Sequence, residues 1–422
     1  MSTLPASLNS VTVGDRANLQ SDFVQKLPAA AAPRIKVLFF TPSLGNGGAE
    51  MHLLRIMNVL ERKEFSISVA VAQSGGSYEA ALAEDVTVYA LTPAGIRSST
   101  IRILRAIKPL HQLIQTHQPD IVCSFQAHAN LAAIIACRGV LPRPKLLVCA
   151  QNSPFAQYHR NWHPLDRLMR LLMAKLYPQA NRMIALSHGV AAELRSLVSS
   201  AQPYQPVPID IIYNAGVDDA VLQGAKIATS LLDRTSQNPV LIACGRLHPQ
   251  KGYVYLLEAF AKVRQSIPAR LLILGEGPLR ASIEQHVKLL GLTDAVQLLG
   301  FQANPYLYMA AADLFVLSSL YEGFGNVIVE AMACGVPVVA TDCPHGPAEI
   351  LGQGKNGLLA RPADANDLAR QILKLLQNPK LQEKFARRGL ERSQAFHASK
   401  IAHDYAEAFR RALLPAFASV ES

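Results

Sequence analysis

The sequence contains few charged residues and no long apolar run. Only 17% of its 422 residues are charged and 50% are apolar, which excludes a disordered chain and leaves material for more than one buried core. At about 150 residues per domain, this length predicts two to three domains. No apolar run reaches the roughly 18 residues that a membrane-spanning helix needs, and no signal-peptide pattern opens the chain. We therefore expect a cytoplasmic protein.

Cysteine is scarce and scattered. The six cysteines include no C-x-x-C pair and have no histidine at ligand spacing, so we expect reduced core residues rather than disulfides or a zinc site. The sequence has no basic-aromatic repeat and no module typical of nucleic-acid binding, so a nucleic-acid partner is not expected. No metal or cofactor is predicted from these patterns.

Positive charge is concentrated in one window. The net charge of the chain is +10, and residues 97–182 alone carry 12 Lys and Arg against 2 Asp and Glu. Inside this window, segments 101–114 and 155–175 mix basic side chains with Leu, Ile and a Trp, a composition that fits anionic lipid headgroups. It also fits helices that pack on a core and expose a basic face. The window predicts an acidic partner, with the anionic inner face of a membrane as our hypothesis.

Short apolar runs alternate with helical patterns from residue 34 onward. This alternation predicts parallel sheets with helices on both faces, an α/β fold of two doubly wound domains. A Pro-rich stretch at 202–208 and a polar, irregular stretch at 216–237 mark a boundary, after which the alternation restarts. The predicted parts are a disordered tail at 1–33, an N-terminal Rossmann-like domain at 34–205, a C-terminal Rossmann-like domain at 206–398, and a helix at 399–422 that packs back towards the N-terminal domain.

Three glycine turns follow predicted strands. The first, at 45–50, does not fit a dinucleotide fingerprint because Glu50 stands where a small residue is required; it predicts contact with a phosphate or sugar, or only a tight turn. The second places Arg246 and Lys251 five residues apart on one loop, where both could bind a diphosphate. Two solvated surface cations are the alternative. The third, at 275–278, is a common turn pattern.

The segment from Glu322 to Glu330 has the most specific pattern. Its two carboxylates stand eight residues apart across a Gly-Phe-Gly turn that leads into a helix. The helix N-terminus at 325–327 would offer N–H groups to a diphosphate. The carboxylates would accept hydrogen bonds from ligand hydroxyls on either side, which gives a reason to place them near apolar residues. The alternative for Glu330 is an ordinary charge on a helix surface.

Together these motifs resemble the retaining glycosyltransferases of family 4, which have the GT-B fold of two facing Rossmann-like domains with a cleft between them. The resemblance covers about residues 34–415. Within the family, the chain is similar to bacterial polysaccharide and glycolipid glycosyltransferases. It depends on the E-x7-E spacing of Glu322 and Glu330 and on three further stretches: Gly47-Gly48-Ala49-Glu50, Gly245-Arg246 with Lys251, and Gly275-Glu276-Gly277-Pro278.

The resemblance implies that the domain at 34–205 is the acceptor side and that the domain at 206–398 binds the nucleotide-sugar. It also implies roles for these residues. Arg246 and Lys251 would bind the diphosphate leaving group, and Glu322 would hold hydroxyls of the donor sugar. Glu330 would hold the ribose hydroxyls. The implied donor-binding residues are Gly47, Gly48, Gly245, Glu276, Phe324, Gly325, Asn326, Val327 and Glu330.

Two residues of the N-terminal domain complete the predicted site. His128 stands between a strand end and a helix start, and the resemblance implies that it contacts the transferred sugar near the reaction centre; an ordinary helix-start histidine is the alternative. Asn152 follows the next predicted strand and is our acceptor-side candidate.

The resemblance also implies the reaction. A hexose or N-acetylhexosamine would pass from a UDP-sugar to a lipid-linked or polysaccharide-precursor acceptor, with an α-linkage, in cell-surface polysaccharide or glycolipid biosynthesis. Arg246 and Lys251 would stabilise negative charge on the departing diphosphate, since the sequence has no D-x-D motif for a metal clamp. Two alternatives stay open: a GDP-sugar, mannosyl-type transferase of the same fold, and an inactive protein that binds nucleotides or a lipid surface.

Overall fold

The computed structural model describes residues 33–45, 47–93, 98–158, 164–199, 207–227 and 238–414. Residues from Ile35 onward belong to one compact unit. The tail predicted at 1–33 lies outside the described residues except for Pro33. Arg97, Trp162 and most of the Pro-rich stretch also lie outside them, as do residues 415–422 of the predicted C-terminal helix.

Seven parallel strands form the first sheet, in the order β3-β2-β1-β4-β5-β6-β7. In the central strand β1, Val37 is the register partner of Ile67 in β2 and of Ile121 in β4. The strand order reverses between β1 and β4, and ligands of open parallel sheets bind outside the carboxyl ends of the strands at such a point. The strands are β1 (Ile35–Thr41), β2 (Phe65–Val71), β3 (Thr87–Ala90), β4 (Ile121–Phe125), β5 (Lys145–Ala150), β6 (Arg182–Ala185) and β7 (Ile209–Ile211).

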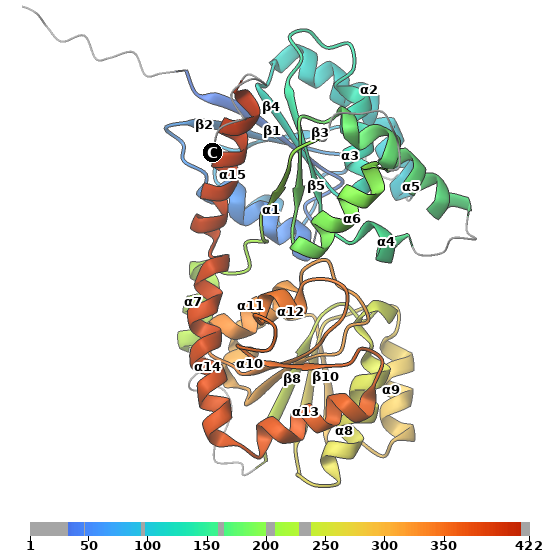
Figure 1. Ribbon diagram of the computed structural model, residues 1–422, viewed down its shortest axis with the longest axis vertical. Coiled ribbons are helices and arrows are strands. Elements are labelled where there is room, and N and C mark those ends of the chain that lie inside the picture. The colour runs from blue at the N-terminus through green and yellow to red at the C-terminus, as the bar shows by residue number, and fades with distance from the viewer. Residues whose placement is uncertain are drawn as a thin grey trace, which may run out of the picture. The chain divides into compact units, whose positions relative to one another are not determined.

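Helices cover both faces of this sheet (Figure 1). Alternate residues of β1 enter different cores: Leu38 packs with α2, α3, α5 and α6, whereas Val37 and Phe39 pack with α1 and α15. Burial on both faces explains why the strand is a continuous apolar run. Among the described residues, no helix is both long and apolar enough to cross a membrane. The helices are α1 (Gly48–Val59), η1 (Glu79–Ala81), α2 (Ser99–His117), α3 (Ala127–Ala136), α4 (Pro154–Gln157), α5 (Pro164–Leu176), η2 (Tyr177–Gln179), α6 (His188–Ser199) and, at the end of the chain, α15 (Ala398–Leu413).

The second sheet has six parallel strands in the order β10-β9-β8-β11-β12-β13. Its order also reverses next to the first strand of the sheet, between β8 and β11, so the two sheets repeat one plan. The strands are β8 (Val240–Cys244), β9 (Arg270–Leu274), β10 (Val296–Gly300), β11 (Leu314–Leu317), β12 (Val338–Thr341) and β13 (Leu358–Ala360); the helices are α7 (Asp219–Ile227), η4 (Pro249–Lys251), α8 (Tyr253–Arg264), α9 (Arg280–Leu289), α10 (Tyr306–Ala311), α11 (Asn326–Ala333), α12 (Pro347–Ile350), α13 (Ala365–Leu376), α14 (Pro379–Ser393) and η5 (Gln394–Phe396).

The segment between the sheets differs from the sequence-based expectation in two ways. β7 pairs with β6, with Ile209 opposite Met183, so strand pairing extends the first sheet beyond residue 205. The stretch expected to be irregular contains α7, and that part of the expectation was wrong. The Asp218 carboxylate accepts a hydrogen bond from the Val221 N–H at 3.0 Å, and Val221 is fully buried. A capping aspartate and one buried valine thus stabilise α7, although the polar composition of this stretch does not predict a helix.

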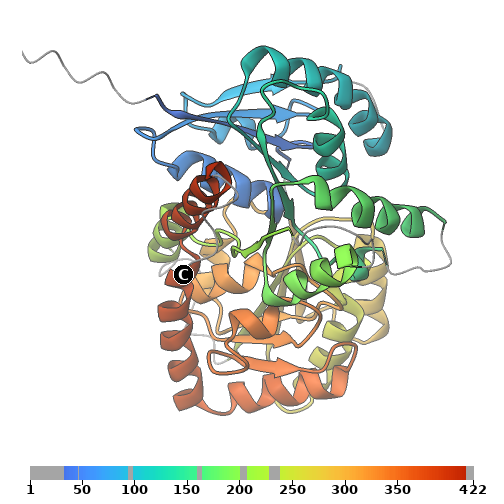
Figure 2. The ribbon, with the colours of Figure 1, turned by 45° about the horizontal axis from the view of Figure 1, so that its top comes forward.

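The C-terminal helix α15 packs on the first sheet through aromatic side chains. The ring of Phe409 lies 6.1 Å from that of Phe39 and 5.9 Å from that of Phe65, both edge-on, and Tyr405 packs beside it at 6.0 Å. Figure 2 shows the red helix beside the blue α1, with which it is in contact. The last helix of the chain is therefore part of the first core.

Candidate functional site

Two loops of the second sheet meet at the carboxyl ends of β8 and β11. The Lys251 ammonium lies 2.5 Å from Glu322 Oε1, and the Ser319 hydroxyl donates to the same oxygen at 2.6 Å. The Ser318 hydroxyl donates to the Lys251 carbonyl oxygen at 2.8 Å, which ties the two loops together. Glu322 is buried, whereas the Lys251 side chain keeps 18% of its surface exposed. The ammonium is thus held in place and still accessible to an anion.

Two glycines allow the loops of this region to approach each other. Gly252 has φ of +60°, and a Cβ atom there would lie 2.2 Å from the Ser318 carbonyl oxygen. Gly275 has φ of +128°, and its Cβ would lie 2.1 Å from the Gly245 carbonyl oxygen. Any side chain at either position would push the loops apart. The predicted glycine turns after β8 and β9 therefore pack backbone against backbone.

Arg246 and Glu276 lie on these neighbouring turns, but their side chains have different surroundings. The Leu247 N–H donates to the Glu276 carbonyl oxygen at 2.9 Å, and the Arg246 side chain is exposed. The Glu276 carboxylate pairs with Arg280 at 2.5 Å. The backbone of Glu276 thus supports the Arg246 turn, while its carboxylate is engaged one helical turn along the chain.

The helix predicted between the two glutamates is α11. Gly325 precedes it with φ of +100°, and Asn326 is its first residue. The buried ring of Phe324 packs against Tyr213 and Phe396, with centroid distances of 5.6 and 5.5 Å. These contacts anchor the Gly-Phe-Gly turn. The first backbone N–H groups of α11, including that of Val327, lie at the N-terminal end of the helix. This is the end at which the helix dipole attracts anions.

The glycine turn of the first sheet lies against the start of α11. The Asn326 side-chain amide donates to the Gly48 carbonyl oxygen at 2.9 Å and accepts from the Asn214 amide at 3.1 Å. The adjacent Gly47 lies beside the Glu50 carboxylate, since a Cβ on Gly47 would lie 2.1 Å from Glu50 Oε2. Residues predicted from separate motifs, Gly48 and Asn326, are therefore in direct contact.

Glu330 is buried in α11 and has a partner that sequence reasoning missed. Arg55 of α1 approaches Glu330 Oε1 to 3.5 Å. Burial raises the pKa of Glu330, and the Arg55 charge acts in the opposite direction. A signal for Arg55 was present: residues 52–57 of α1 are all buried, and a charged side chain in a helix buried all round needs a partner. Glu330 is not the helix-surface charge of the alternative interpretation.

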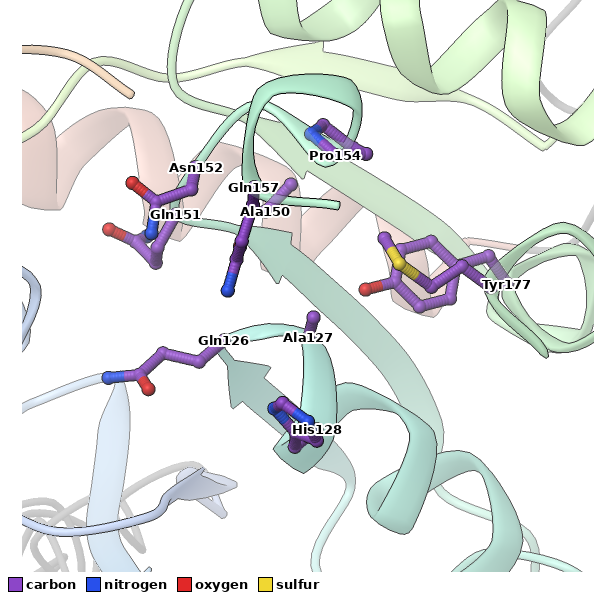
Figure 3. A pocket seen from close by; sticks show the side chains of 10 residues that line it. Gln126, Ala127, His128, Ala150, Gln151, Asn152, Pro154, Gln157 and Tyr177 are labelled. Carbon is purple, nitrogen blue, oxygen red and sulfur yellow. The ribbon is translucent and has the colours of Figure 1, made fainter. Parts of the chain in front are cut away.

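A small cavity of about 40 Å³, open to solvent, lies where β4 and β5 end. Figure 3 shows Gln126 and His128 on the segment that follows β4, with Gln151, Asn152 and Gln157 across the cavity from them. Among the described residues, those that line the cavity include no Asp, Glu, Lys or Arg, and these side chains suit uncharged polar groups such as sugar hydroxyls.

His128 lies in the first turn of α3, because the helix begins at Ala127. Burial lowers the pKa of His128, which favours the neutral imidazole. The edge-to-face contact with the Tyr158 ring, 6.4 Å between centroids, fixes its orientation. A neutral imidazole can donate or accept a hydrogen bond at the cavity wall.

Asn152 is exposed and lies next to the loop that carries Glu322. A Cβ on Gly323 would lie 2.5 Å from the Gln151 carbonyl oxygen and 3.0 Å from the Asn152 Cα. Asn152 and Gly323, the residue after Glu322, are therefore neighbours. Within the described ranges, no three His, Cys, Asp or Glu side chains are grouped so that they could hold a metal ion.

Comparison with protein families gives two matches, one over most of the first sheet and one over the second sheet. Residues 46–220 match the family described as Glycosyltransferase Family 4, and residues 232–392 match the family described as Glycosyl transferases group 1.

Individual proteins resemble the chain over nearly its whole length. It is 29% identical to the N-acetylgalactosamine-N,N'-diacetylbacillosaminyl-diphospho-undecaprenol 4-alpha-N-acetylgalactosaminyltransferase of Campylobacter jejuni, over 87% of this chain and 98% of the relative. It is 24% identical to the lipopolysaccharide core biosynthesis glycosyltransferase LpsD of Rhizobium meliloti, over 86% and 95%. The crystal structure of Anabaena HepE in complex with UDP-glucose superposes with a TM-score of 0.72 at 25% identity, over 89% of this chain and 99% of that one.

Proposed function

The chain belongs to glycosyltransferase family 4, and from this premise we propose that it moves a hexose or N-acetylhexosamine from a UDP-sugar to a lipid-linked or polysaccharide-precursor acceptor. The family consists of retaining enzymes, so the new bond would be an α-glycosidic bond. The relatives from Campylobacter and Rhizobium are named for transfer to a diphospho-undecaprenol-linked sugar and for lipopolysaccharide core synthesis. Their names support an acceptor that is a precursor of a cell-surface glycan.

The Lys251–Glu322 pair is the observation that carries this proposal. It lies at the carboxyl ends of β8 and β11, the point of strand-order reversal where ligands of such sheets bind. Lys251 and the exposed Arg246 supply positive charge on one loop, and the first N–H groups of α11 add to it. The departing diphosphate gains negative charge during transfer, and fixed positive groups stabilise that charge more than they stabilise the bound donor.

The remaining residues have roles on either side of the diphosphate. Glu322 accepts hydrogen bonds from hydroxyls of the donor sugar through the part of its carboxylate that does not bind Lys251. Glu330 accepts hydrogen bonds from the ribose hydroxyls. His128 lines the cavity as a neutral imidazole and contacts the transferred sugar. Asn152, beside Gly323, contacts the acceptor.

A donor panel tests the proposed reaction. The purified protein is incubated with UDP- and GDP-linked hexoses and N-acetylhexosamines, with and without an undecaprenyl-diphosphate-linked sugar as acceptor, and products are identified by mass spectrometry and by the anomeric coupling in NMR. We expect a UDP-sugar to be consumed and an α-linked product to form. Transfer only from GDP-sugars would favour the mannosyl-type alternative, and nucleotide binding without turnover would favour the inactive one.

A surface of exposed apolar and basic side chains supports a membrane-bound acceptor. On α5, Leu165, Leu168 and Leu171 are 63, 48 and 51% exposed. On α2, Ile101 and Leu104 are 49 and 61% exposed. Both helices pack against α3 and therefore lie on one face of the first sheet (Figure 1). We call this set the α2–α5 surface; its exposed basic residues are Arg105 and Lys108 on α2 and Arg167 and Lys175 on α5.

We predict that the α2–α5 surface binds anionic vesicles. Replacing Leu168 and Leu171 together by Ser should weaken sedimentation with phosphatidylglycerol vesicles about tenfold or more, because two leucines lose their burial in the headgroup region. The matched control replaces Leu289 and Leu390, exposed on α9 and α14, and should leave binding unchanged. Binding by the unaltered protein should fall as salt rises. Equal binding by the two double variants would contradict the assignment of this surface.

A further inference from the structure

We propose that Arg55, on the first helix of the N-terminal domain, is a positioning residue for the donor: it holds the Glu330 carboxylate of the C-terminal domain in the geometry that receives the ribose. The inference rests on the proposed function, because it gives Arg55 a role in the same donor site. Arg55 would act through Glu330, whose Oε1 it approaches to 3.5 Å.

Arg55 is fixed by contacts from three segments. Its side chain is only 2% exposed. The guanidinium donates to Asp218 Oδ2 at 2.7 Å, to the Ala215 carbonyl oxygen at 3.1 Å and to the Tyr306 hydroxyl at 3.0 Å. Glu330 is the fourth neighbour, at 3.5 Å through Oε1. Since a guanidinium is planar and carries a fixed fork of donors, these partners set the direction in which it presents charge to Glu330.

His52, one turn before Arg55, fixes the same stretch of backbone. Its Nδ1 accepts from the Ala215 N–H at 2.8 Å, while Arg55 binds the carbonyl oxygen of that residue. Burial lowers the pKa of His52 to about 3, so the ring stays neutral and can accept this hydrogen bond. The two side chains, at i and i+3 on α1, thus clamp the chain where it passes between the two sheets.

The two helices α1 and α11 are aligned by a second contact. Gly48 and Arg55 are two turns apart on α1, and their partners Asn326 and Glu330 are one turn apart on α11. α1 therefore contacts α11 at two places: at its first residue, Asn326, and at Glu330, the carboxylate that we propose binds the ribose. Donor binding should depend on this docking, because a buried carboxylate without a counter-charge is neutral or displaced.

The charges around Glu330 determine how a variant should respond to pH. Arg55 of α1 is the one cation among the groups that act on it, and Asp218 is a second carboxylate. The other titratable neighbours are the hydroxyls of Tyr78 and Tyr306 and the thiols of Cys244 and Cys334. Burial already raises the pKa of Glu330, and removal of Arg55 raises it further. Donor affinity of such a variant should then fall as pH decreases and recover as pH rises, when Glu330 ionises.

The test is a double-mutant cycle on UDP binding, measured by calorimetry from pH 6 to pH 9. We expect Arg55→Met to weaken UDP binding about tenfold or more at neutral pH, the scale of one lost charged hydrogen-bond partner, with partial recovery at high pH. Arg55→Lys, which keeps the charge, should lose less. Glu330→Gln should remove both the Arg55 dependence and its pH dependence, so the double variant should bind like Glu330→Gln alone.

Arg264 on α8 provides the control for Arg55. Arg264→Met removes an arginine that also donates to one carboxylate, Asp294, and one backbone carbonyl, that of Ala269, and it should bind UDP normally. Losses that add in the double variant, or a pH-independent loss in Arg55→Met, would overturn the proposal. If Arg55→Met does not fold, Arg55→Lys decides: its smaller loss of UDP affinity should disappear in the Glu330→Gln background, and a loss that adds to that of Glu330→Gln would overturn the proposal. An unaltered protein that binds no UDP would refute the proposed function instead.

Discussion

Replacing Lys251 by Ala should lower kcat for sugar transfer by about 10²–10³, the cost of removing one preorganised donor that faces developing negative charge. The reason is the position of its ammonium, which Glu322 holds at 2.5 Å while part of the side chain stays accessible. The effect should appear mainly in kcat, because the charge on the leaving diphosphate grows only during bond cleavage. Steady-state kinetics with the donor identified by the panel measure both constants.

A lysine of the same region serves as the control for this prediction. Lys262 is exposed on α8, the helix that starts just after Lys251, and Lys262→Ala should leave kcat within twofold of the unaltered enzyme. Glu322→Gln should also lower kcat, and adding Lys251→Ala to it should cost much less than the single change does, since the two groups act as a unit. Full activity of Lys251→Ala would remove the assigned role of the cation.

Replacing Phe409 by Ala should destabilise the N-terminal domain by about 3–5 kcal/mol, the usual cost of truncating a buried phenylalanine. Phe409 is fully buried between Phe39, Phe65 and Tyr405, which come from β1, β2 and α15 itself. The cavity left behind would face two neighbouring strands of the first sheet, β1 and β2. Guanidinium unfolding followed by near-ultraviolet circular dichroism measures the effect.

Phe301 provides the matched control for Phe409. It is 59% exposed, so Phe301→Ala should change the free energy of unfolding by less than about 0.5 kcal/mol. Indistinguishable unfolding curves for the two variants would mean that α15 does not contribute to the first core.

Much of the fold could be predicted because its signals are local. Buried strands of a parallel sheet are apolar on both faces, so runs such as Ile35–Phe40 stand out, and their alternation with helices predicts two doubly wound domains. The likeness to glycosyltransferase structures confirms the predicted GT-B fold. α7 was missed because its stability comes from the Asp218 cap and the burial of Val221, which composition does not reveal.

The candidate site could be predicted only in part, because sequence spacing reports contacts between residues that are close along the chain and not contacts between distant segments. Glu322, Gly325 and Glu330 belong to one turn and helix, so their spacing carries the signal. The pairing of Lys251 with Glu322 joins residues 71 positions apart and depends on the adjacency of β8 and β11. Arg55 meets Glu330 across the two domains, a contact that no spacing within either motif encodes.

A crystal structure with UDP bound tests the central claim most directly. We predict that the diphosphate lies within hydrogen-bonding distance of Lys251 Nζ and of the Arg246 guanidinium, and that the ribose hydroxyls lie within hydrogen-bonding distance of the Glu330 carboxylate. A nucleotide bound elsewhere, with Lys251 still paired only with Glu322, would contradict the assignment of the donor site to the loops after β8 and β11.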